Sequence, residues 1–315
     1  MNNFPLVSVI IPCYNAEKYV EQAVRSMMEQ TYADLEILCC DDCSTDGTFA
    51  ILQKLAAEDS RVKLFKNETN QKIVKTLNSL VAAANGKYIA RMDADDISLP
   101  KRIEKQVAFL EGNPDYALCG TNAWHIDGSG RRIGKSYLSI SNCEIKRTKF
   151  IRCPFYHPAV CIRSDILKQN KYDYFFDKVE DYDLWLRIIE KNNTFNLKER
   201  LLKYRKTSSG ISYNYSDEIR RKLIALFSKY LNISAQDAAE YVLAFYTRPE
   251  KTSSDKVKKI VYDRFKKSNL FLNAACLKKE YCFARKNRQL AKYIIFHPFI
   301  FLMFIFKSLC LFIGN

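Results

Sequence analysis

Three carboxylates stand close together at Asp93, Asp95 and Asp96, directly after an apolar run at 87–91 that is typical of a buried strand. Carboxylates crowded in this way repel one another unless a positive charge lies among them. Hard divalent cations take oxygen ligands, and Mg²⁺ commonly binds one or two protein carboxylates together with substrate phosphates. The stretch therefore predicts a metal–diphosphate site. The alternative is a solvated acidic turn before a helix that starts near Pro100.

The chain before this stretch alternates between strand and helix patterns, and these elements must position the carboxylates. Strands are expected at 7–11, 36–40, 62–65 and 87–91, with helices at 17–30, 48–57 and 74–85. Strands joined by single crossover helices form a parallel sheet covered on both faces, and ligands bind at the carboxyl ends of its strands. Three polar loops are expected at those ends, at 12–15, 41–47 and 93–96.

The second half of the chain is less regular. Helices are expected at 101–111 and 142–152, an apolar stretch at 116–126, a hairpin turn at 127–130, a loop entering a strand at 155–162 and a last strand at 201–204. A further helix opens at Glu180 and carries Trp185 on its apolar face. Trp124 is also expected in the core, although an aromatic residue beside a sugar site can stack on the sugar. We predict an α/β domain at 1–212, a helical basic region at 213–292 and a hydrophobic tail at 293–315.

The positive charge is concentrated in the C-terminal region. The chain has a net charge of +15, and the stretch 251–292 holds 13 Lys or Arg against three Asp or Glu. A nucleic-acid-binding protein would need a basic face with exposed aromatic residues or a known module, and the sequence shows no such module. The 11 cysteines match no zinc or redox spacing and follow no signal peptide, so we expect reduced thiols in a cytosolic setting.

The tail at 293–315 is strongly apolar, with Pro298 and Lys307 as interruptions. A spanning helix needs about 20 apolar residues, so the tail is a borderline candidate for a clean span. The basic helices before it would be attracted to the anionic cytoplasmic leaflet. We therefore expect a monotopic anchor on the cytoplasmic face of the membrane. A C-terminal span and burial against a second subunit are the alternatives.

Five stretches together resemble the family 2 glycosyltransferases, which have the GT-A nucleotide-sugar-binding fold. They are Val7–Asn15, Asp41–Thr48, Ala84–Asp96, His157–Pro158 and Glu180–Arg187, in the family's order. The resemblance implies transfer of a sugar from a nucleotide diphosphate donor, usually a UDP-sugar, with inversion at the anomeric carbon. Two local departures are the missing glycine after Asn70 and the Thr207 that stands where a His is frequent. The Gln-x-x-Arg-Trp signature of processive synthases is also missing, which favours addition of a single sugar.

The resemblance assigns residues to the nucleotide. Asp42, with Asp41 beside it, would accept a hydrogen bond from the ring NH of uracil, because a charged acceptor discriminates against bases that lack this donor. Three residues after the first strand would shape the pocket for the base and the ribose: Pro12, Tyr14 and Asn15. The alternative is that the loop at 41–47 only caps a helix through Ser44 or Thr45.

For the diphosphate, the resemblance identifies an Asp-x-Asp motif. Asp95 would bind the divalent cation, Mn²⁺ or Mg²⁺, and Asp93 would reach the ribose or a metal-bound water. Asp96 would hold the backbone of the motif or help to orient the donor sugar. The cation would take up charge as the nucleotide diphosphate leaves. Arg205, near the last strand, would reach the diphosphate.

On the acceptor side, inversion needs a base on the face of the sugar opposite the leaving group. By resemblance Asp181 is that base, and Glu180 is the reserve candidate, which would otherwise hydrogen-bond the acceptor or the loop. Asp183 is expected in the first turn of a helix, where the helix dipole favours it. His157 would contact the acceptor or the diphosphate, although a lone His is more often a structural hydrogen-bonding residue.

Together these features predict an inverting, metal-dependent hexosyl or N-acetylhexosaminyl transferase. A lipid-linked or cell-surface glycan is the expected acceptor, because a membrane-associated enzyme would share the surface with it. Two rival functions are weaker. A non-catalytic nucleotide-sugar-binding protein would not need Asp93, Asp95 and Asp181 together, and a basic nucleic-acid-binding protein lacks a module.

Overall fold

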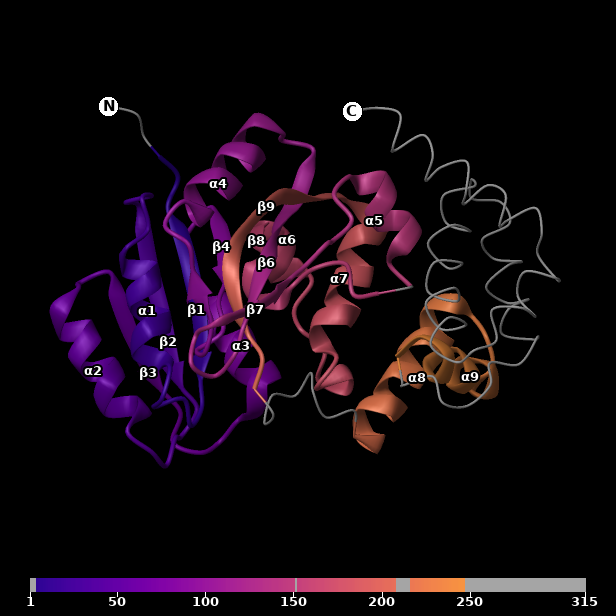
Figure 1. Cartoon of the computed structure of the whole chain (residues 1–315), viewed down its shortest axis with the longest axis horizontal. Coiled ribbons are helices and arrows are strands. Elements are labelled where there is room, and N and C mark those ends of the chain that lie inside the picture. The colour runs from indigo at the N-terminus through magenta and orange to yellow at the C-terminus, as the bar shows by residue number, and fades with distance from the viewer. Residues whose placement is uncertain (1–3, 151, 208–215, 247–315) are drawn as a thin grey trace. The chain divides into compact units, whose positions relative to one another are not determined.

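The computed structural model describes residues 4–150, 152–207 and 216–246 (Figure 1). The first part of the chain alternates between strand and helix. Its elements are β1 (Val7–Cys13), α1 (Val20–Met28), β2 (Leu35–Asp41), α2 (Thr48–Glu58), β3 (Val62–Lys66), α3 (Lys72–Ala83) and β4 (Tyr88–Arg91). Every strand and helix predicted for this part is present, with its ends shifted by a few residues at most.

The later elements are more varied. They are β5 (Ile97–Ser98), α4 (Arg102–Gly112), β6 (Tyr116–Ile126), β7 (Arg132–Lys135), α5 (Asn142–Thr148), β8 (Cys161–Arg163), α6 (Ser164–Gln169), α7 (Glu180–Lys191) and β9 (Asn193–Arg205). Short 3₁₀ helices lie at His157–Ala159 and Tyr174–Phe176. Two more helices, α8 (Asp217–Leu231) and α9 (Ala235–Tyr246), complete the described part of the chain.

The strands of the described residues belong to one sheet. Along it the order is β3-β2-β1-β4-β8-β6-β9-β5, and β7 pairs with β6. β1 lies parallel to β2 and β4, and β2 lies parallel to β3, as their crossover helices require. Further along the sheet, β8 runs antiparallel to β4 and β6, whereas β6 and β9 are parallel. The predicted α/β class is confirmed: pairing from β3 to β4 is wholly parallel, and beyond β4 the sheet is mixed.

Helices cover both faces of the sheet. Val9 and Ile11 of β1 pack in one core with α1, α2 and α4, whereas Ile10 between them packs in a second core with α3 and α7. Successive side chains of a strand point to opposite faces, so a strand covered on both sides is apolar throughout. Trp185 of α7 is fully buried in the second core, as predicted.

The last strand is longer than predicted. β9 begins at Asn193 rather than near residue 201. The prediction missed its first half because that half carries polar side chains, some of them buried. Asn196, for example, is buried and donates from Nδ2 to two carbonyl oxygens, those of Ser139 (2.8 Å) and Pro154 (3.1 Å). Such a strand lacks the apolar pattern by which strands are recognised in a sequence. α5 is, conversely, shorter than predicted.

The described residues up to Val242 form one compact unit, which includes α8 and most of α9. These helices lie in the first part of the stretch 213–292, for which a helical basic region was predicted. The division into domains after residues 212 and 292 stays a prediction, and the tail at 293–315 lies outside the described residues. In the part of the chain that the structure describes, no helix is both long and apolar enough to cross a membrane.

Candidate active site

The loops after β1, β2 and β4 share one edge of the sheet, as parallel pairing predicts. Asn15 joins the first two, because its Oδ1 accepts from the backbone N of Thr45 (2.9 Å) and its own N donates to Ser44 Oγ (3.0 Å). Asn15 has a φ of 48°, a left-handed conformation in which Asn is enriched. Ser44 and Thr45 therefore connect loops and do not cap α2. Asp46 accepts from the first helical N–H, that of Thr48 (3.0 Å).

The two carboxylates at the end of β2 have different surroundings. Asp42 Oδ1 accepts from Asn67 Nδ2 (2.7 Å) and from the backbone N of Gln71 (2.8 Å), so Asp42 fastens the segment between β3 and α3. Asp41 is fully buried, and its Oδ1 has no hydrogen-bond partner among the described residues. A buried oxygen without a partner is costly, so a donor on a ligand would be favoured there. The contact of uracil with Asp42 stays a prediction, but Asp41 has the free acceptor.

Pro12 and Tyr14 lie on either side of the end of β1. Pro12 is buried in the strand, opposite Cys40 of β2, whereas Tyr14 is 50% exposed just beyond it. A half-exposed aromatic ring is available for stacking, and the proline restricts the backbone that leads to it. Their contacts with a base and a ribose stay predictions.

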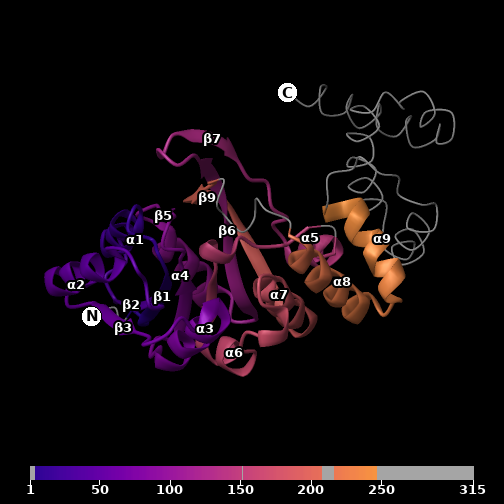
Figure 2. The same cartoon turned by 90° about the horizontal axis from the view of Figure 1, so that it is seen from below.

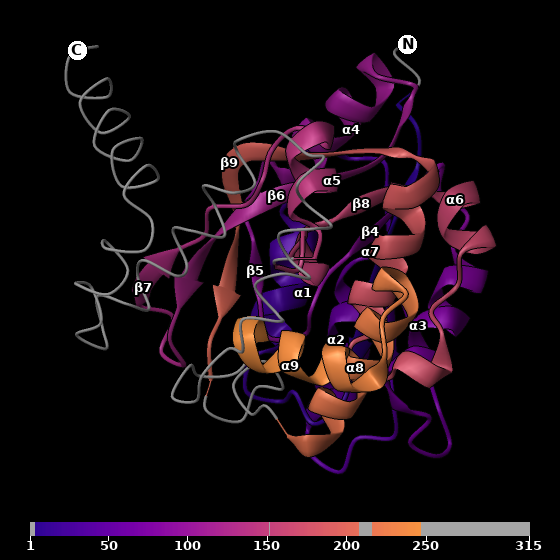
Figure 3. The same ribbon diagram turned by 90° about the vertical axis from the view of Figure 1, so that its right-hand side faces the viewer.

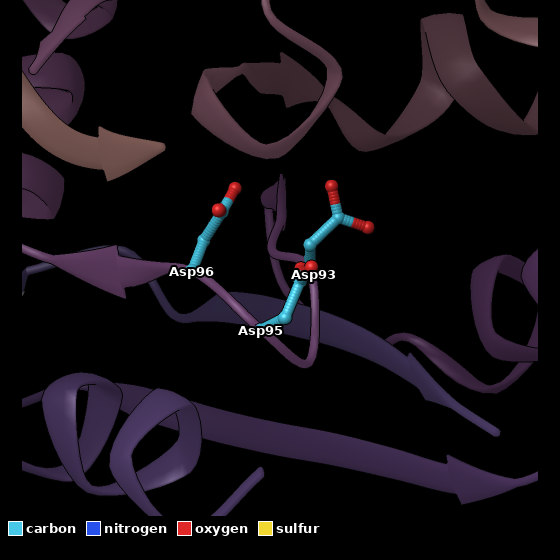
Figure 4. Close-up of side chains that lie close together, drawn as sticks. All are labelled: Asp93, Asp95 and Asp96. Carbon is cyan, nitrogen blue, oxygen red and sulfur yellow. The ribbon is translucent and has the colours of Figure 1, made fainter. Parts of the chain in front are cut away.

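Asp93, Asp95 and Asp96 form a tight cluster after β4. One oxygen of each lies within 4.8 Å of the others, and the three side chains project to the same side of the loop (Figure 4). Burial, and then the charge of Asp93, raises the pKa of Asp95 to about 6. The same causes raise the pKa of Asp96 well above its usual range, and Asp96 Oδ2 has no hydrogen-bond partner in the described structure. Mutual repulsion therefore remains within the cluster.

Arg91, the last residue of β4, is a positive charge beside these carboxylates. It is 4% exposed and forms an ion pair with Asp93. Burial raises the pKa values of three further carboxyl groups, and the charge of Arg91 opposes this effect at each: Asp95, Glu180 and Asp181. Arg91 thus acts on the acidic cluster and on the start of α7 at the same time. It was not among the predicted site residues, although an arginine between an apolar strand and three carboxylates is a usable signal.

Arg205, at the end of β9, holds the backbone of the acidic loop. Its N donates to Asp96 Oδ1 and its Nε to the carbonyl oxygen of Asp95, both at 2.7 Å. The terminal nitrogens donate to the carbonyl oxygen of Asp127 (3.1 Å) and to Gln22 Oε1 (2.9 Å). Asp96 thus holds the backbone at the end of β9, while Arg205 holds the backbone of the acidic loop, and the two roles predicted for Asp96 stay predictions. Contact of Arg205 with a diphosphate stays a prediction, and here its guanidinium fixes the loop.

The two carboxylates that open α7 differ in their protonation. Burial raises the pKa of Asp181 to about 6, opposed by a hydrogen bond from the backbone N of Tyr182 (2.7 Å). Burial, and then the charge of Asp181, raises the pKa of Glu180 to about 8. At neutral pH Asp181 is therefore mainly ionised and Glu180 mainly protonated. Only the ionised group can accept a proton, which is consistent with the predicted order of these two candidates.

His157 belongs to the same buried group. Its Nε2 lies 2.8 Å from the hydroxyl of Tyr172, and its Nδ1 lies 4.0 Å from Glu180 Oε1. Burial, and then the charge of Arg91, lowers the pKa of His157 well below its usual value, so the ring is neutral. Its contact with acceptor or diphosphate stays a prediction. Tyr172 is a further site residue, and no motif in the sequence marks it.

The acidic cluster has the donor set that a divalent cation needs. Carboxylate oxygens are the ligands that hard cations prefer, and the buried Oδ2 of Asp96 lacks a partner in the described structure. One Arg91 beside three carboxylates leaves the site negative, so a cation would relieve their repulsion. Asp181, which also interacts with Arg91 and Asp93, adds a group that can accept a proton. The arrangement can bind an anionic group through a cation and deprotonate a hydroxyl beside it.

Comparison with known proteins identifies a family for this geometry. The sequence profile of glycosyl transferase family 2 matches residues 8–170, which is more than half of the chain. Among the relatives is an Escherichia coli protein, UDP-Glc:alpha-D-GlcNAc-diphosphoundecaprenol beta-1,3-glucosyltransferase WfgD. The two chains are 33% identical over 221 residues, which cover 69% of this chain and 83% of WfgD.

Two solved structures share the fold. TarS of S. aureus, residues 1–349 in complex with UDP-GlcNAc, has a TM-score of 0.62 at 18% identity, with 90% of this chain and 89% of that chain covered. The mannosyltransferase PcManGT of Pyrobaculum calidifontis, in complex with GDP-Man and Mn²⁺, has a TM-score of 0.59 at 16% identity, with 93% and 86% covered. At these identities the likeness concerns the fold, which is the expected GT-A fold. The family match and the relative together show that the chain belongs to glycosyl transferase family 2.

Proposed function

We propose that this glycosyltransferase moves one hexose or N-acetylhexosamine from a UDP-sugar to a hydroxyl group of a lipid-linked glycan, with inversion. The observation that carries the proposal is the carboxylate cluster Asp93–Asp96 with its ion pair to Arg91, whose charge also acts on Asp181. The cluster would bind the diphosphate through a cation, and Asp181 would take the proton of the acceptor. Related proteins support the substrate classes: WfgD is named for a UDP-Glc donor and a diphosphoundecaprenol-linked acceptor, and TarS bound UDP-GlcNAc.

The donor would be held at three points. The free Oδ1 of Asp41 suits the ring NH of uracil, while Asp42 keeps the neighbouring segment in place. Asp95 and Asp93 would bind Mn²⁺ or Mg²⁺. Bound there, the cation supplies Lewis-acid stabilisation of the charge on the departing diphosphate. Tyr14, exposed at the end of β1, would lie against the nucleotide.

The proposed chemical step is a single displacement. The acceptor oxygen bonds to the anomeric carbon while the bond from that carbon to the diphosphate oxygen breaks, and UDP leaves with the electron pair. The hydroxyl proton moves to the carboxylate of Asp181. A base with a pKa of about 6 is ionised at neutral pH and still accepts a proton readily. Glu180, protonated near His157, would position the acceptor rather than react with it.

The proposal places the enzyme at the cytoplasmic face of the membrane, where a lipid-linked acceptor is available. The apolar tail at 293–315, preceded by 13 Lys or Arg in 251–292, supports this location. Deletion of 293–315 should therefore reduce the fraction of the chain that sediments with membranes. Full membrane binding after the deletion would show that the anchor lies elsewhere.

A transfer assay tests the reaction. The full-length protein is incubated with Mn²⁺, a synthetic prenyl diphosphate-linked sugar and, in turn, UDP-glucose, UDP-GlcNAc and GDP-mannose. We expect one added sugar by mass spectrometry, from a UDP donor, and an inverted anomeric configuration by NMR. Several sugars per acceptor, or retention of configuration, would contradict the proposal.

Two variants with the same chemical change locate the base. Asp181→Asn should abolish product while UDP-sugar binding persists. Asp165→Asn, an exposed acidic residue in the first turn of α6, is the matched control and should keep the wild-type rate. Equal rates in both variants would remove Asp181 from the mechanism.

A further inference from the structure

A cationic aromatic surface lies on β6, β7 and β9. Trp124 of β6 stands between Lys135 of β7 and Lys203 of β9, its direct partners in the two strand pairings. Directly paired residues of neighbouring strands share one face of a sheet. Arg132 stacks on the indole, with its Cζ 3.2 Å from the Trp124 ring centroid. Arg200 Cζ lies 5.0 Å from the Trp124 ring centroid. Two arginines thus lie over one tryptophan, and two lysines are its direct partners on the neighbouring strands.

This position corrects the expectation that Trp124 is a core residue. Its side chain is only partly buried, because it lies near the end of β6, where β6 pairs with the short strand β7. The hairpin formed by the ends of these strands projects from the rest of the sheet (Figure 2), and a second view shows the same projection (Figure 3). The indole therefore remains accessible from solvent.

Two exposed apolar side chains complete the surface. Ile133 of β7 is 53% exposed, and Tyr137, just after β7, is 63% exposed. Tyr137 has Lys135 Nζ at 5.3 Å and Arg200 Cζ at 5.1 Å from its ring centroid. We refer to the following residues as the hairpin patch: Trp124, Arg132, Ile133, Lys135, Tyr137 and Arg200.

Among the described residues, no acidic side chain forms an ion pair with the cations of the hairpin patch. The stretch 131–137 contains three cations and no acidic residue. Arg131 pairs with Asp127 (3.2 Å), but no carboxylate of the described residues lies within ion-pair distance of Arg132 or Lys135. A surface that combines free cations with exposed aromatic and aliphatic groups is suited to a partner that is anionic at its surface and apolar beneath it.

We propose that the hairpin patch is a docking surface for a bilayer that contains anionic phospholipids. Its cations would attract the headgroups, its rings would lie at the interface, and Ile133 would enter the acyl region. A second copy of the chain is a poor occupant, because pairing of two free β7 edges would oppose like charges. Nucleic acid would match the charge but offers Ile133 no apolar environment.

Bilayer contact at this surface would bring the acidic loop close to the membrane. The turn between β6 and β7 offers the carbonyl oxygens of Asp127 (3.1 Å) and Gly128 (3.4 Å) to Arg205 Nη1. The same guanidinium donates to the carbonyl oxygen of Asp95. A docked hairpin would thus serve a lipid-linked acceptor, but docking itself requires no sugar transfer. It can be tested without donor or acceptor, independently of the proposed reaction.

Tryptophan fluorescence of the full-length protein gives a local readout. The chain has two tryptophans, and Trp185 is fully buried, so a response to vesicles reports on Trp124. The vesicles are phosphatidylcholine alone or mixed with phosphatidylglycerol, both with brominated acyl chains that quench nearby indoles. We expect quenching by the anionic vesicles only, and loss of that response in Trp124→Phe. Sedimentation is measured in parallel, because the tail at 293–315 could hold the chain on vesicles by itself.

Charge neutralisation tests the patch directly. The double variant Arg132→Gln with Lys135→Gln should raise the concentration of anionic lipid needed for half-maximal quenching about thirtyfold. The matched control, Lys54→Gln with Lys101→Gln, removes two exposed cations outside the patch and should change it little. Circular dichroism establishes that each variant is folded.

Three results would overturn the proposal. In the first, the chain sediments with anionic vesicles while the emission of Trp124 is unchanged. In the second, the chain does not bind anionic vesicles. In the third, duplex DNA shifts the emission of Trp124 and anionic vesicles do not, which would assign the hairpin patch to nucleic acid.

Discussion

Asp181 and Glu180 are adjacent in sequence, yet their surroundings suit them to different tasks. Burial raises both pKa values, but the backbone N of Tyr182 donates to Asp181. A hydrogen bond to the ionised form opposes the effect of burial. Glu180 Oε2 has no hydrogen-bond partner in the described structure, and its pKa is the higher of the two. The start of α7 therefore offers one ionised and one protonated carboxyl group near neutral pH.

The pH dependence of transfer should reflect Asp181. Turnover under saturating donor is expected to rise with pH through an apparent pKa near 6 and then level off, because only the ionised form accepts the proton. Since the two carboxyl groups interact, the apparent value belongs to the pair. The charged and titratable groups that act on Asp181 and its neighbour are Arg91, Asp93, Cys153, Tyr172 and Asp177. A kcat that is constant from pH 5 to pH 8 would exclude Asp181 as the base.

Asp41 and Asp42 should respond differently to substitution. Asp42→Ala removes the acceptor of two hydrogen bonds and should lower the free energy of unfolding by about 1–3 kcal/mol. Asp41→Asn replaces a buried oxygen that has no partner in the described structure, and should raise the KM for a UDP-sugar at least about tenfold. Urea unfolding and donor kinetics on both variants separate these effects. If Asp42→Ala changed only KM and Asp41→Asn only stability, the two roles would be exchanged.

Motifs in the sequence predicted the carboxylates of the candidate site, but not all of the residues that connect them. The carboxylates after β2 and β4 follow strand ends, and such positions can be read from a sequence. Tyr172 lies in an irregular segment and reaches His157 through the tertiary fold. Arg205 was predicted at the site, but its contacts with Asp95 and Asp96 were not, because these residues lie in a loop that is distant in sequence.

Among the elements, α8 supports the helix that carries Asp181. Asp183, fully buried in the first turn of α7, accepts from Arg187 Nε (2.8 Å), from the hydroxyl of Tyr230 (2.8 Å) and from Lys229 Nζ (3.3 Å). The position of Asp183 in the first turn was predicted, but its partners on α8 were not, since no local pattern links the two helices. A buried carboxylate with three donors fixes α7 against α8.

Removal of the Asp183 carboxylate should destabilise the folded protein. Asp183→Ala removes the acceptor of three hydrogen bonds and is expected to lower the free energy of unfolding by about 1.5–3 kcal/mol, because Arg187 keeps two carbonyl acceptors. Tyr230→Phe removes one hydrogen bond and should cost about 1 kcal/mol. Urea denaturation of the two variants measures the difference. Equal losses of unfolding free energy in the two variants would mean that Asp183 contributes no more than its hydrogen bond from Tyr230.

The sheet shows which elements can be read from sequence. The first four strands could be predicted because apolar runs alternate with amphipathic helices at a regular interval. The order β8-β6-β9 could not, because these strands pair in a mixed arrangement that no short crossover dictates. Nor was the projecting hairpin foreseen: its turn at 127–130 was predicted, but the exposure of Trp124 depends on how far β6 and β9 extend past β8.

For the molecule as a whole, charge is distributed unevenly between its surfaces. The net charge is +15, yet the edge formed by the loops after β2 and β4 gathers five aspartates: Asp41, Asp42, Asp93, Asp95 and Asp96. The hairpin patch instead carries Arg132 and Arg200 over Trp124, and its cations have no ion-pair partner among the described residues. A donor complex of cation and diphosphate suits the first surface, and an anionic bilayer suits the second. Composition alone shows neither surface, because most of the net charge comes from the stretch 251–292.

The stability of the whole molecule should therefore depend on bound cation. Mn²⁺ is expected to raise the melting temperature, because three carboxylates within 4.8 Å repel one another without it, and UDP should add to the effect by mass action. Ligands at 100 times their Kd would add about 2.7 kcal/mol, or about 5–10 °C for a unit of this size. Asp95→Asn should melt at a higher temperature than the wild type in EDTA and respond little to Mn²⁺, whereas Asp165→Asn should keep the full response. A Mn²⁺ shift of equal size in both variants would mean that the cation binds elsewhere on the protein.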